Sequence, residues 1–167
     1  MATTAQRLHV AAVIHELYAY RAHLLYPDND VRTSFDSFCW GLTETETFAR
    51  LKAGEYVQDD CSQKMAWTWR CAGLWHWRDP GYTGTDLVRL PVHYTNAREA
   101  GVGAGVIFGP GTGHHGALVL EPDPAGGNPL CGSHGRAGYD LVRLHDLATE
   151  QADMGFPGVR FLSIAHL

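Results

Sequence analysis

Apolar positions follow a helical period in the first half of the chain and the shorter period of strands in the second half. Between Leu8 and Leu25 they recur every three or four residues until Pro27 interrupts the pattern, which predicts an amphipathic helix. The sequence Thr43-Glu44-Thr45-Glu46 matches a capping box and predicts a second, short helix that ends near Gly54.

A third and stronger helix is predicted from Cys61 to Ala72. Asp59 or Asp60 can cap its N-terminus, and Gly73 provides a C-terminal stop. Its side chains are apolar nearly all the way round, which is typical of a helix buried in a core.

Short apolar runs separated by glycine- and proline-rich turns begin after Gly105 and predict an antiparallel sheet. The predicted strands are Val106–Phe108, His115–Leu120, Ser133–Gly135, Tyr139–Leu144 and Phe161–Ile164. Helices followed by strands indicate an α+β fold. A chain of 167 residues suits one domain. We divide it into a helical N-terminal part, residues 1–56, and a core, residues 57–167.

Composition and charge exclude several classes of partner. The net charge of −5 argues against a nucleic-acid partner and gives no support to a basic membrane-binding patch. Charged residues and histidines interrupt the longest apolar-rich stretch, Leu8 to Leu25, so we expect no membrane span. The first residues lack the order of a secretion signal, which favours a reducing cytoplasm and free thiols. The four cysteines show no CxxC spacing, and we expect neither a metal nor a cofactor.

Cys61 is the candidate nucleophile because it opens the third predicted helix. Backbone N–H groups at a helix start favour a thiolate and can hold an oxyanion during acyl transfer. Considered alone, a cysteine is more often a buried core residue. Asp59 and Asp60 would oppose thiolate formation, so the chemistry requires a basic partner.

The basic partner is sought among ten histidines, most of which have ordinary surface or packing interpretations. His114 and His115 follow a glycine turn and open an apolar strand. Because neighbouring strand residues point to opposite faces, at most one of them can face Cys61. We predict His115 as the base, since the buried strand follows it. His134, on the next strand, is predicted to orient the His115 imidazole.

The segments "DCSQKMAWTWRCAG", "DPGYTGT", "GPGTGHHGALVLE" and "SHG" carry a resemblance that covers roughly Val57 to Leu144. In order and spacing they resemble NlpC-type papain-like cysteine peptidases, in particular the peptidase domains of endolysins from phages of actinobacteria. The resemblance implies a papain-like fold with Cys61 as nucleophile, His115 as base and His134 as the orienting residue. It also implies cleavage of an amide bond in the stem peptides of bacterial peptidoglycan.

The chain departs from that family at three places. Gln63-Lys64 follows "DCS", where the family often has a small or aromatic residue. His114 stands where related lysins often have Asp. The family's tyrosine upstream of the cysteine has no clear counterpart, because Tyr56 is poorly spaced for it.

Aromatic residues after the third helix suggest a substrate wall. We predict substrate contacts by Trp75, Trp77, Tyr82 and His114. The partner is then the peptidoglycan stem peptide, met either by a lysis enzyme released from the host cytoplasm or by a peptidase on a phage particle. The alternatives are an N-acetylmuramoyl-L-alanine amidase, an acyltransferase, and a non-catalytic virion or wall-binding module. A metal hydrolase with Cys and His ligands is a further alternative, but no HxH, HExxH or CxxC spacing supports it.

Overall fold

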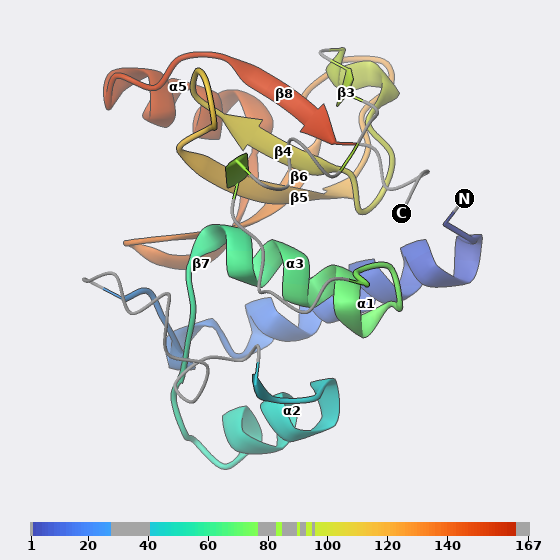
Figure 1. Ribbon diagram of the computed structural model, residues 1–167, viewed down its shortest axis with the longest axis vertical. Coiled ribbons are helices and arrows are strands. Elements are labelled where there is room, and N and C mark those ends of the chain that lie inside the picture. The colour runs from blue at the N-terminus through green and yellow to red at the C-terminus, as the bar shows by residue number, and fades with distance from the viewer. Residues whose placement is uncertain are drawn as a thin grey trace.

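The computed structural model describes residues 2–27, 41–76, 83–84, 90, 93–94 and 96–162, which form an α+β fold (Figure 1). Its helices are α1 (Thr4–Ala19), α2 (Glu44–Lys52), α3 (Cys61–Cys71) and α5 (Leu144–Asp153), with short 3-10 turns at Arg21–His23 and Ala97–Glu99. Its strands are β1 (Leu24–Leu25), β2 (Val57–Gln58), β3 (His93–Tyr94), β4 (Gly105–Phe108), β5 (His115–Glu121), β6 (Leu130–Gly135), β7 (Gly138–Arg143) and β8 (Val159–Leu162).

Capping groups predicted from the sequence begin two of these helices. The Thr43 side chain accepts from the Glu46 backbone N–H, and the Glu46 carboxylate accepts from Thr43, so the predicted capping box of α2 is confirmed. Asp60 caps α3. Gly73, just past the end of α3, has a φ of 67°, a left-handed conformation that glycine adopts without a steric penalty. The apolar helix predicted near Leu8 to Leu25 is α1, and it ends at Ala19.

Strands β3, β8, β4, β5, β6 and β7 form one sheet in that order, and every neighbouring pair is antiparallel. Helices α1 and α3 cover one face of the sheet, and α5 covers the other (Figure 1). Leu118 and Leu120 of β5 therefore pack with α1 and α3, while Ala117 and Val119 pack with α5. As a result, β5 is buried on both faces until Glu121.

A separate two-stranded parallel ladder joins the N-terminal segment to the start of α3. Leu24 of β1 pairs with Val57 of β2, and Leu25 pairs with Gln58. The backbone N–H of Asp59 extends the ladder by donating to the Leu25 carbonyl, at 3.2 Å. This pairing places Tyr26, the residue after Leu25, beside the first turn of α3, although the two segments are distant in sequence.

Two elements at the C-terminal end differ from the sequence-based expectation. Leu144 does not end a strand; it begins α5, which the sequence analysis did not predict. The spacing of the buried residues Leu144, Leu147 and Gln151 is helical, so one face of α5 was readable in the sequence. The predicted last strand is present as β8, but it lies between β3 and β4, and residues 163–164 fall outside the described part.

In the described part of the chain, no helix has both the length and the apolar character needed to cross a bilayer.

Close packing of α3 on the sheet at Gly105 gives a test of this architecture. A Cβ at Gly105 would lie 2.9 Å from Cη2 of Trp69, whose side chain is fully buried. We expect Gly105→Ala to lower the free energy of unfolding by about 1–3 kcal/mol, because the ring has no space in which to retreat. Gly101→Ala is the matched control, since its Cβ meets only the flexible end of Arg7. Urea denaturation of both variants measures the difference, and equal stabilities would contradict the packing described.

Candidate active site

Cys61 is the first residue of α3, and the cap of that helix fixes its surroundings. Oδ1 of Asp60 accepts from the backbone N–H of Gln63 and from the Ser62 hydroxyl, each at 2.9 Å. The Gln63 side chain in turn accepts from the Asp60 N–H at 3.3 Å. The carboxylate next to Cys61 is therefore engaged in holding the helix start, where unpaired N–H groups favour a negative charge.

Three donors surround the Cys61 sulfur. The hydroxyl of Tyr26 approaches Sγ at 3.9 Å, and the backbone N–H groups of Gly116 and Ser62 also point to it. The residue is only 6% exposed. The β1–β2 ladder explains the first donor, because it carries Tyr26 to the start of α3.

Burial decides the protonation state of this thiol in the described conformation. Desolvation, with a smaller contribution from the Asp60 carboxylate, raises the pKa of Cys61 to about 11, against the lowering effect of the three donors. Burial raises the pKa of Cys131 to about 12 and that of Cys71 still further. Cys61 is thus the most acidic of the three described cysteines, but it is a neutral thiol at neutral pH.

The structure does not bring the three predicted catalytic residues together. His134 lies on the face of the sheet covered by α1 and α3, and it lines a cavity of about 10 Å³ together with Cys61 and Gly116. His115 lies on the opposite face, where its strand partner is Phe108 in the core under α5. The predicted hydrogen bond between His134 and His115 is therefore absent. Neither imidazole hydrogen-bonds Sγ within the described residues.

Two-sided burial of the sheet explains this difference. His115 was preferred to His114 because a buried strand follows it. Strand β5 is buried on both faces, however, so burial of the strand does not indicate which of its faces meets Cys61.

His115 has a different partner, Ser133 on β6. Its Nε2 lies 2.8 Å from the Ser133 hydroxyl, and both residues are buried. Desolvation lowers the pKa of His115 to about 4, and the nearby His114 and His134 add to the effect. His115 is thus a neutral imidazole through the physiological range.

His134 is part of a buried charged cluster instead. Its Nδ1 lies 2.9 Å from Oδ1 of Asp59, and Nζ of Lys64 lies 2.7 Å from Oδ2 of the same carboxylate. The His134 contact is short but is not aligned as a hydrogen bond. The Tyr26 ring meets the His134 ring edge-on, with centroids 5.5 Å apart, so Tyr26 touches both the sulfur and this imidazole.

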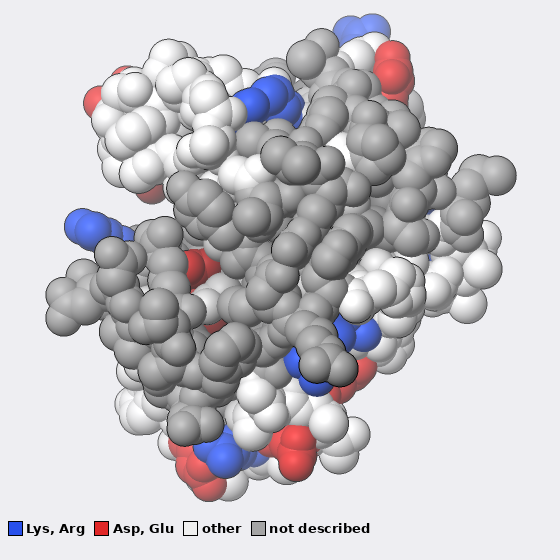
Figure 2. Space-filling model, viewed as in Figure 1, with Lys and Arg blue, Asp and Glu red and all other residues white. Residues whose placement is uncertain are grey.

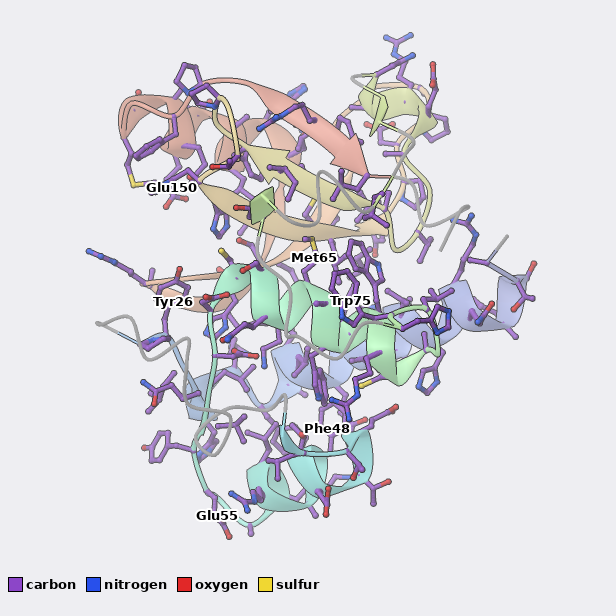
Figure 3. All side chains as sticks on the ribbon, viewed as in Figure 1. Tyr26, Phe48, Glu55, Met65, Trp75 and Glu150 are labelled. Carbon is purple, nitrogen blue, oxygen red and sulfur yellow. The ribbon has the colours of Figure 1, made fainter. Side chains whose placement is uncertain are left out.

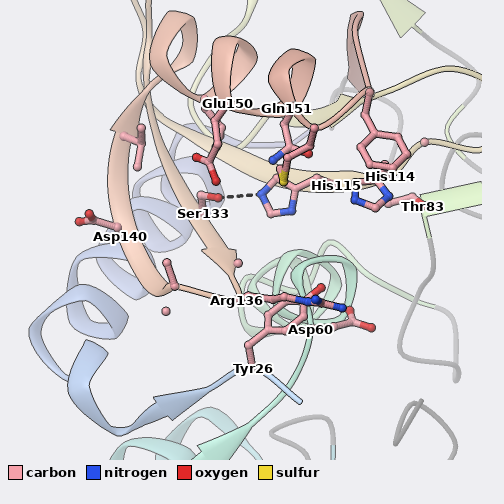
Figure 4. A pocket seen from close by; sticks show the side chains of 18 of the residues that line it. Tyr26, Asp60, Thr83, His114, His115, Ser133, Arg136, Asp140, Glu150 and Gln151 are labelled. Carbon is pink, nitrogen blue, oxygen red and sulfur yellow. Dashed lines mark hydrogen bonds between the residues drawn. The ribbon is translucent and has the colours of Figure 1, made fainter. Parts of the chain in front are cut away.

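A groove of about 1130 Å³ runs past the start of α3 and around the end of the sheet. Tyr26, Asp60 and Arg136 lie on one side of it, and His115 and Glu150 lie on the other (Figure 4). Acidic side chains are visible in a hollow on the face shown in Figure 2. Cys61 does not line the groove, but Asp60 precedes it in the chain and Tyr26 contacts its sulfur. The groove therefore passes next to Cys61, because the residue before Cys61 and the side chain that contacts its sulfur both line it.

The predicted substrate-contacting residues have different locations. His114 is exposed, lines the groove and stacks on Phe156, with ring centroids 3.4 Å apart. Trp75 is 4% exposed, stacks on Trp69 in the core and lies toward the end of α3 away from Tyr26 (Figure 3). Its predicted role as a substrate wall is therefore wrong in this structure. Trp77 and Tyr82 lie outside the described residues.

Among the residues that the structure describes, no three His, Cys, Asp or Glu side chains are grouped so that they could hold a metal ion.

Four site residues were missed or misjudged in the sequence. Tyr26, whose hydroxyl contacts the Cys61 sulfur, was not considered from the sequence, and only the β1–β2 pairing reveals its position. Asp59 was considered as a helix cap and as a charge that opposes the thiolate, and Lys64 only as a departure from a motif. Both are buried. Ser133 was predicted only as part of a strand; it pairs with Ala117, so it lies on the same face of the sheet as His115, two residues along β5.

Removing the Tyr26 hydroxyl should make Cys61 less acidic. Because this hydroxyl lowers the pKa of Cys61, we expect Tyr26→Phe to slow alkylation of Cys61 by iodoacetamide about two- to fivefold below pH 9, as expected for the loss of one weak hydrogen bond. Tyr56→Phe is the control, since Tyr56 is 61% exposed. Mass spectrometry of the Cys61 peptide gives the rate. An unchanged rate would show that the hydroxyl does not stabilise the thiolate.

His115 should make the fold sensitive to acid. Its pKa falls from 6.5 to about 4 on folding, so the unfolded chain takes up a proton at a higher pH than the folded one does. The stabilisation is complete above pH 6.5 and is lost as the pH falls to about 4, by about 3 kcal/mol in total. We expect the unfolding free energy of His115→Gln to fall less steeply over this interval. Parallel pH dependences for parent and variant would contradict the buried, neutral state of His115.

Comparison of the chain with protein-family models, with curated proteins and with solved structures finds no match in any of the three. The chemistry of the side chains around Cys61 and the groove is therefore the basis for assigning a function.

Proposed function

We propose that this protein is a cysteine peptidase of papain-like, NlpC type that cleaves an amide bond in the stem peptides of bacterial peptidoglycan. The observation that carries the proposal is the position of Cys61, which begins a buried helix with three donors around its sulfur, one residue from a large groove. A thiol in such surroundings is suited to nucleophilic attack on a carbonyl.

The groove supports a peptide with charges of both signs as the substrate. Its described lining includes the guanidinium of Arg136 and the carboxylates of Asp60, Asp140 and Glu150. A stem peptide has free carboxylates that can pair with Arg136. Where it contains a diamino acid, it also has an ammonium group that can pair with the carboxylates of the groove. The motifs between Val57 and Leu144, which resemble phage endolysins, favour a role in lysis or in wall entry by a bacteriophage.

Formation of an acyl-enzyme accounts for these parts of the site. The sulfur attacks the scissile carbonyl, and its proton passes to an imidazole. The N–H groups at the start of α3 and at Gly116 can stabilise the oxyanion. The amine leaves with a proton, and water then releases the acyl group from Cys61.

A non-catalytic wall-binding module is the second candidate, and one observation favours it. In the described conformation the thiol is buried and its pKa is raised to about 11, with no hydrogen bond to an imidazole. A protein that binds the wall without cleaving it needs no ionised thiol, so the raised pKa of Cys61 is compatible with this role.

Substitution of Cys61 separates the two candidates. We expect the parent protein to release new amino groups from purified peptidoglycan and Cys61→Ala to release none, because loss of a nucleophile leaves almost no activity. Cys71→Ala is the matched control, because Cys71 lies at the opposite end of the same helix. The readouts are amine release and mass spectrometry of the soluble fragments, with circular dichroism to verify folding.

The fragments also identify the bond that is cut. Split stem peptides support the endopeptidase, whereas intact stems would indicate an amidase, and the absence of soluble fragments would favour a transferase. Wall binding without amine release by the parent, or equal release by the parent and Cys61→Ala, would overturn the proposed peptidase.

A further inference from the structure

Asp59, Lys64 and His134 form a charged cluster that is closed to solvent. The side chains are 0%, 4% and 0% exposed, respectively. A buried carboxylate is strongly unfavourable unless an opposite charge lies against it, and here the Lys64 ammonium does so at 2.7 Å. The chain therefore maintains a costly arrangement whose third member is an imidazole.

The Asp59 carboxylate favours a proton on one nitrogen of His134 over the other. Oδ1 of Asp59 lies 2.9 Å from Nδ1; the contact is not aligned as a hydrogen bond, but a negative charge at that distance favours a proton on Nδ1 rather than on Nε2. Nε2 then bears the lone pair. Nε2 is buried and has no hydrogen-bond partner within the described residues. An unprotonated ring nitrogen without a partner is a group that can accept a proton.

Cys61 and His134 share one side of the sheet. They line the same small cavity, and Tyr26 contacts the sulfur with its hydroxyl while its ring and the imidazole pack in a T-shaped arrangement. The only other buried imidazole among the described residues, His115, points to the opposite face and is bonded to Ser133. The titratable groups that adjoin or act on His134 are Asp59, Cys61, Lys64, Tyr26, Tyr139 and, through the sheet, His115.

We propose that His134 is the base that takes the Cys61 proton, and that Asp59 is a positioning residue that holds the His134 ring while Lys64 balances its charge. This inference rests on the proposed peptidase function and replaces His115 as the predicted base. The S–H bond breaks as its proton moves to Nε2, and the electron pair of sulfur forms the bond to the substrate carbonyl carbon. When the C–N bond breaks, the proton on Nε2 passes to the leaving amine. The sulfur–Nε2 hydrogen bond that this requires forms on substrate binding, as apo sites commonly lack it.

Alkylation of Cys61 by iodoacetamide tests the proton transfer without any cell-wall substrate. In the full chain at pH 7, we expect Asp59→Asn and His134→Gln each to slow alkylation of the Cys61 peptide about tenfold or more. Alkylation of the variant Asp59→Asn/His134→Gln should be no slower than that of His134→Gln alone, because the two residues act as one unit. His115→Gln is the matched histidine control and should change the rate less than about twofold.

The reverse pattern would overturn the inference. If His115→Gln slows alkylation while Asp59→Asn and His134→Gln do not, His115 is the base and the buried cluster has only a structural role. Because this readout needs no peptidoglycan, it can fail while wall hydrolysis succeeds, and the reverse also holds. The failure of this inference is thereby distinguished from the failure of the proposed function.

A charge-balanced variant guards against misfolding. Asp59→Asn leaves Lys64 without its buried counter-charge, so Asp59→Asn/Lys64→Met removes both charges together. We expect this double variant to fold, with circular dichroism like that of the parent, and still to alkylate slowly. On peptidoglycan it should lower kcat and leave KM nearly unchanged, since Asp59 touches no substrate. If folded Asp59→Asn/Lys64→Met showed the alkylation rate and kcat of the parent, the positioning role of Asp59 would be excluded.

Discussion

Burial of the central sheet on both faces is the constraint on which the arrangement of the site depends. Each strand of β4, β5 and β6 divides its side chains between a core under α1 and α3 and a core under α5. The position of a polar residue along one of these strands therefore decides whether its side chain lies in the core under α1 and α3 or in the core under α5. His134 falls on the side of Cys61, and His115 and Ser133 fall on the other. The chemistry available to the sulfur follows from that division.

Local signals in the sequence were sufficient for most of the fold. The capping groups at Thr43 and Asp60 fixed the starts of α2 and α3, and glycine-rich turns separated β4, β5 and β6, because both kinds of signal act within a few residues. The strand order was not readable, since the insertion of β8 between β3 and β4 is a long-range pairing. Helix α5 was not predicted although the buried residues Leu144, Leu147 and Gln151 have helical spacing, because Leu144 also continues the apolar run of the preceding strand.

The same distinction between local and long-range information applies to the site. Cys61 was identified from its position at a predicted helix start, which is a local property. Tyr26 was not, because its contact with the sulfur depends on a ladder between segments more than thirty residues apart in the sequence. The roles of Asp59 and Lys64 also depend on tertiary packing, since their charges look like an ordinary solvated helix start until burial turns them into a pair. The face on which His115 lies could not be predicted, because a single sequence does not show which helices cover each face of a strand.

The β1–β2 ladder has a mechanical consequence for access to the sulfur. It is a two-residue pairing with one further backbone hydrogen bond, and of its N-terminal strand only Leu24 is anchored in the core, while Leu25 is 44% exposed. The Tyr26 hydroxyl, one of the three donors around the Cys61 sulfur, is therefore positioned by this short ladder and not by the six-stranded sheet. A change that weakens this ladder is thus expected to alter the surroundings of the sulfur while the pairing of the large sheet is kept.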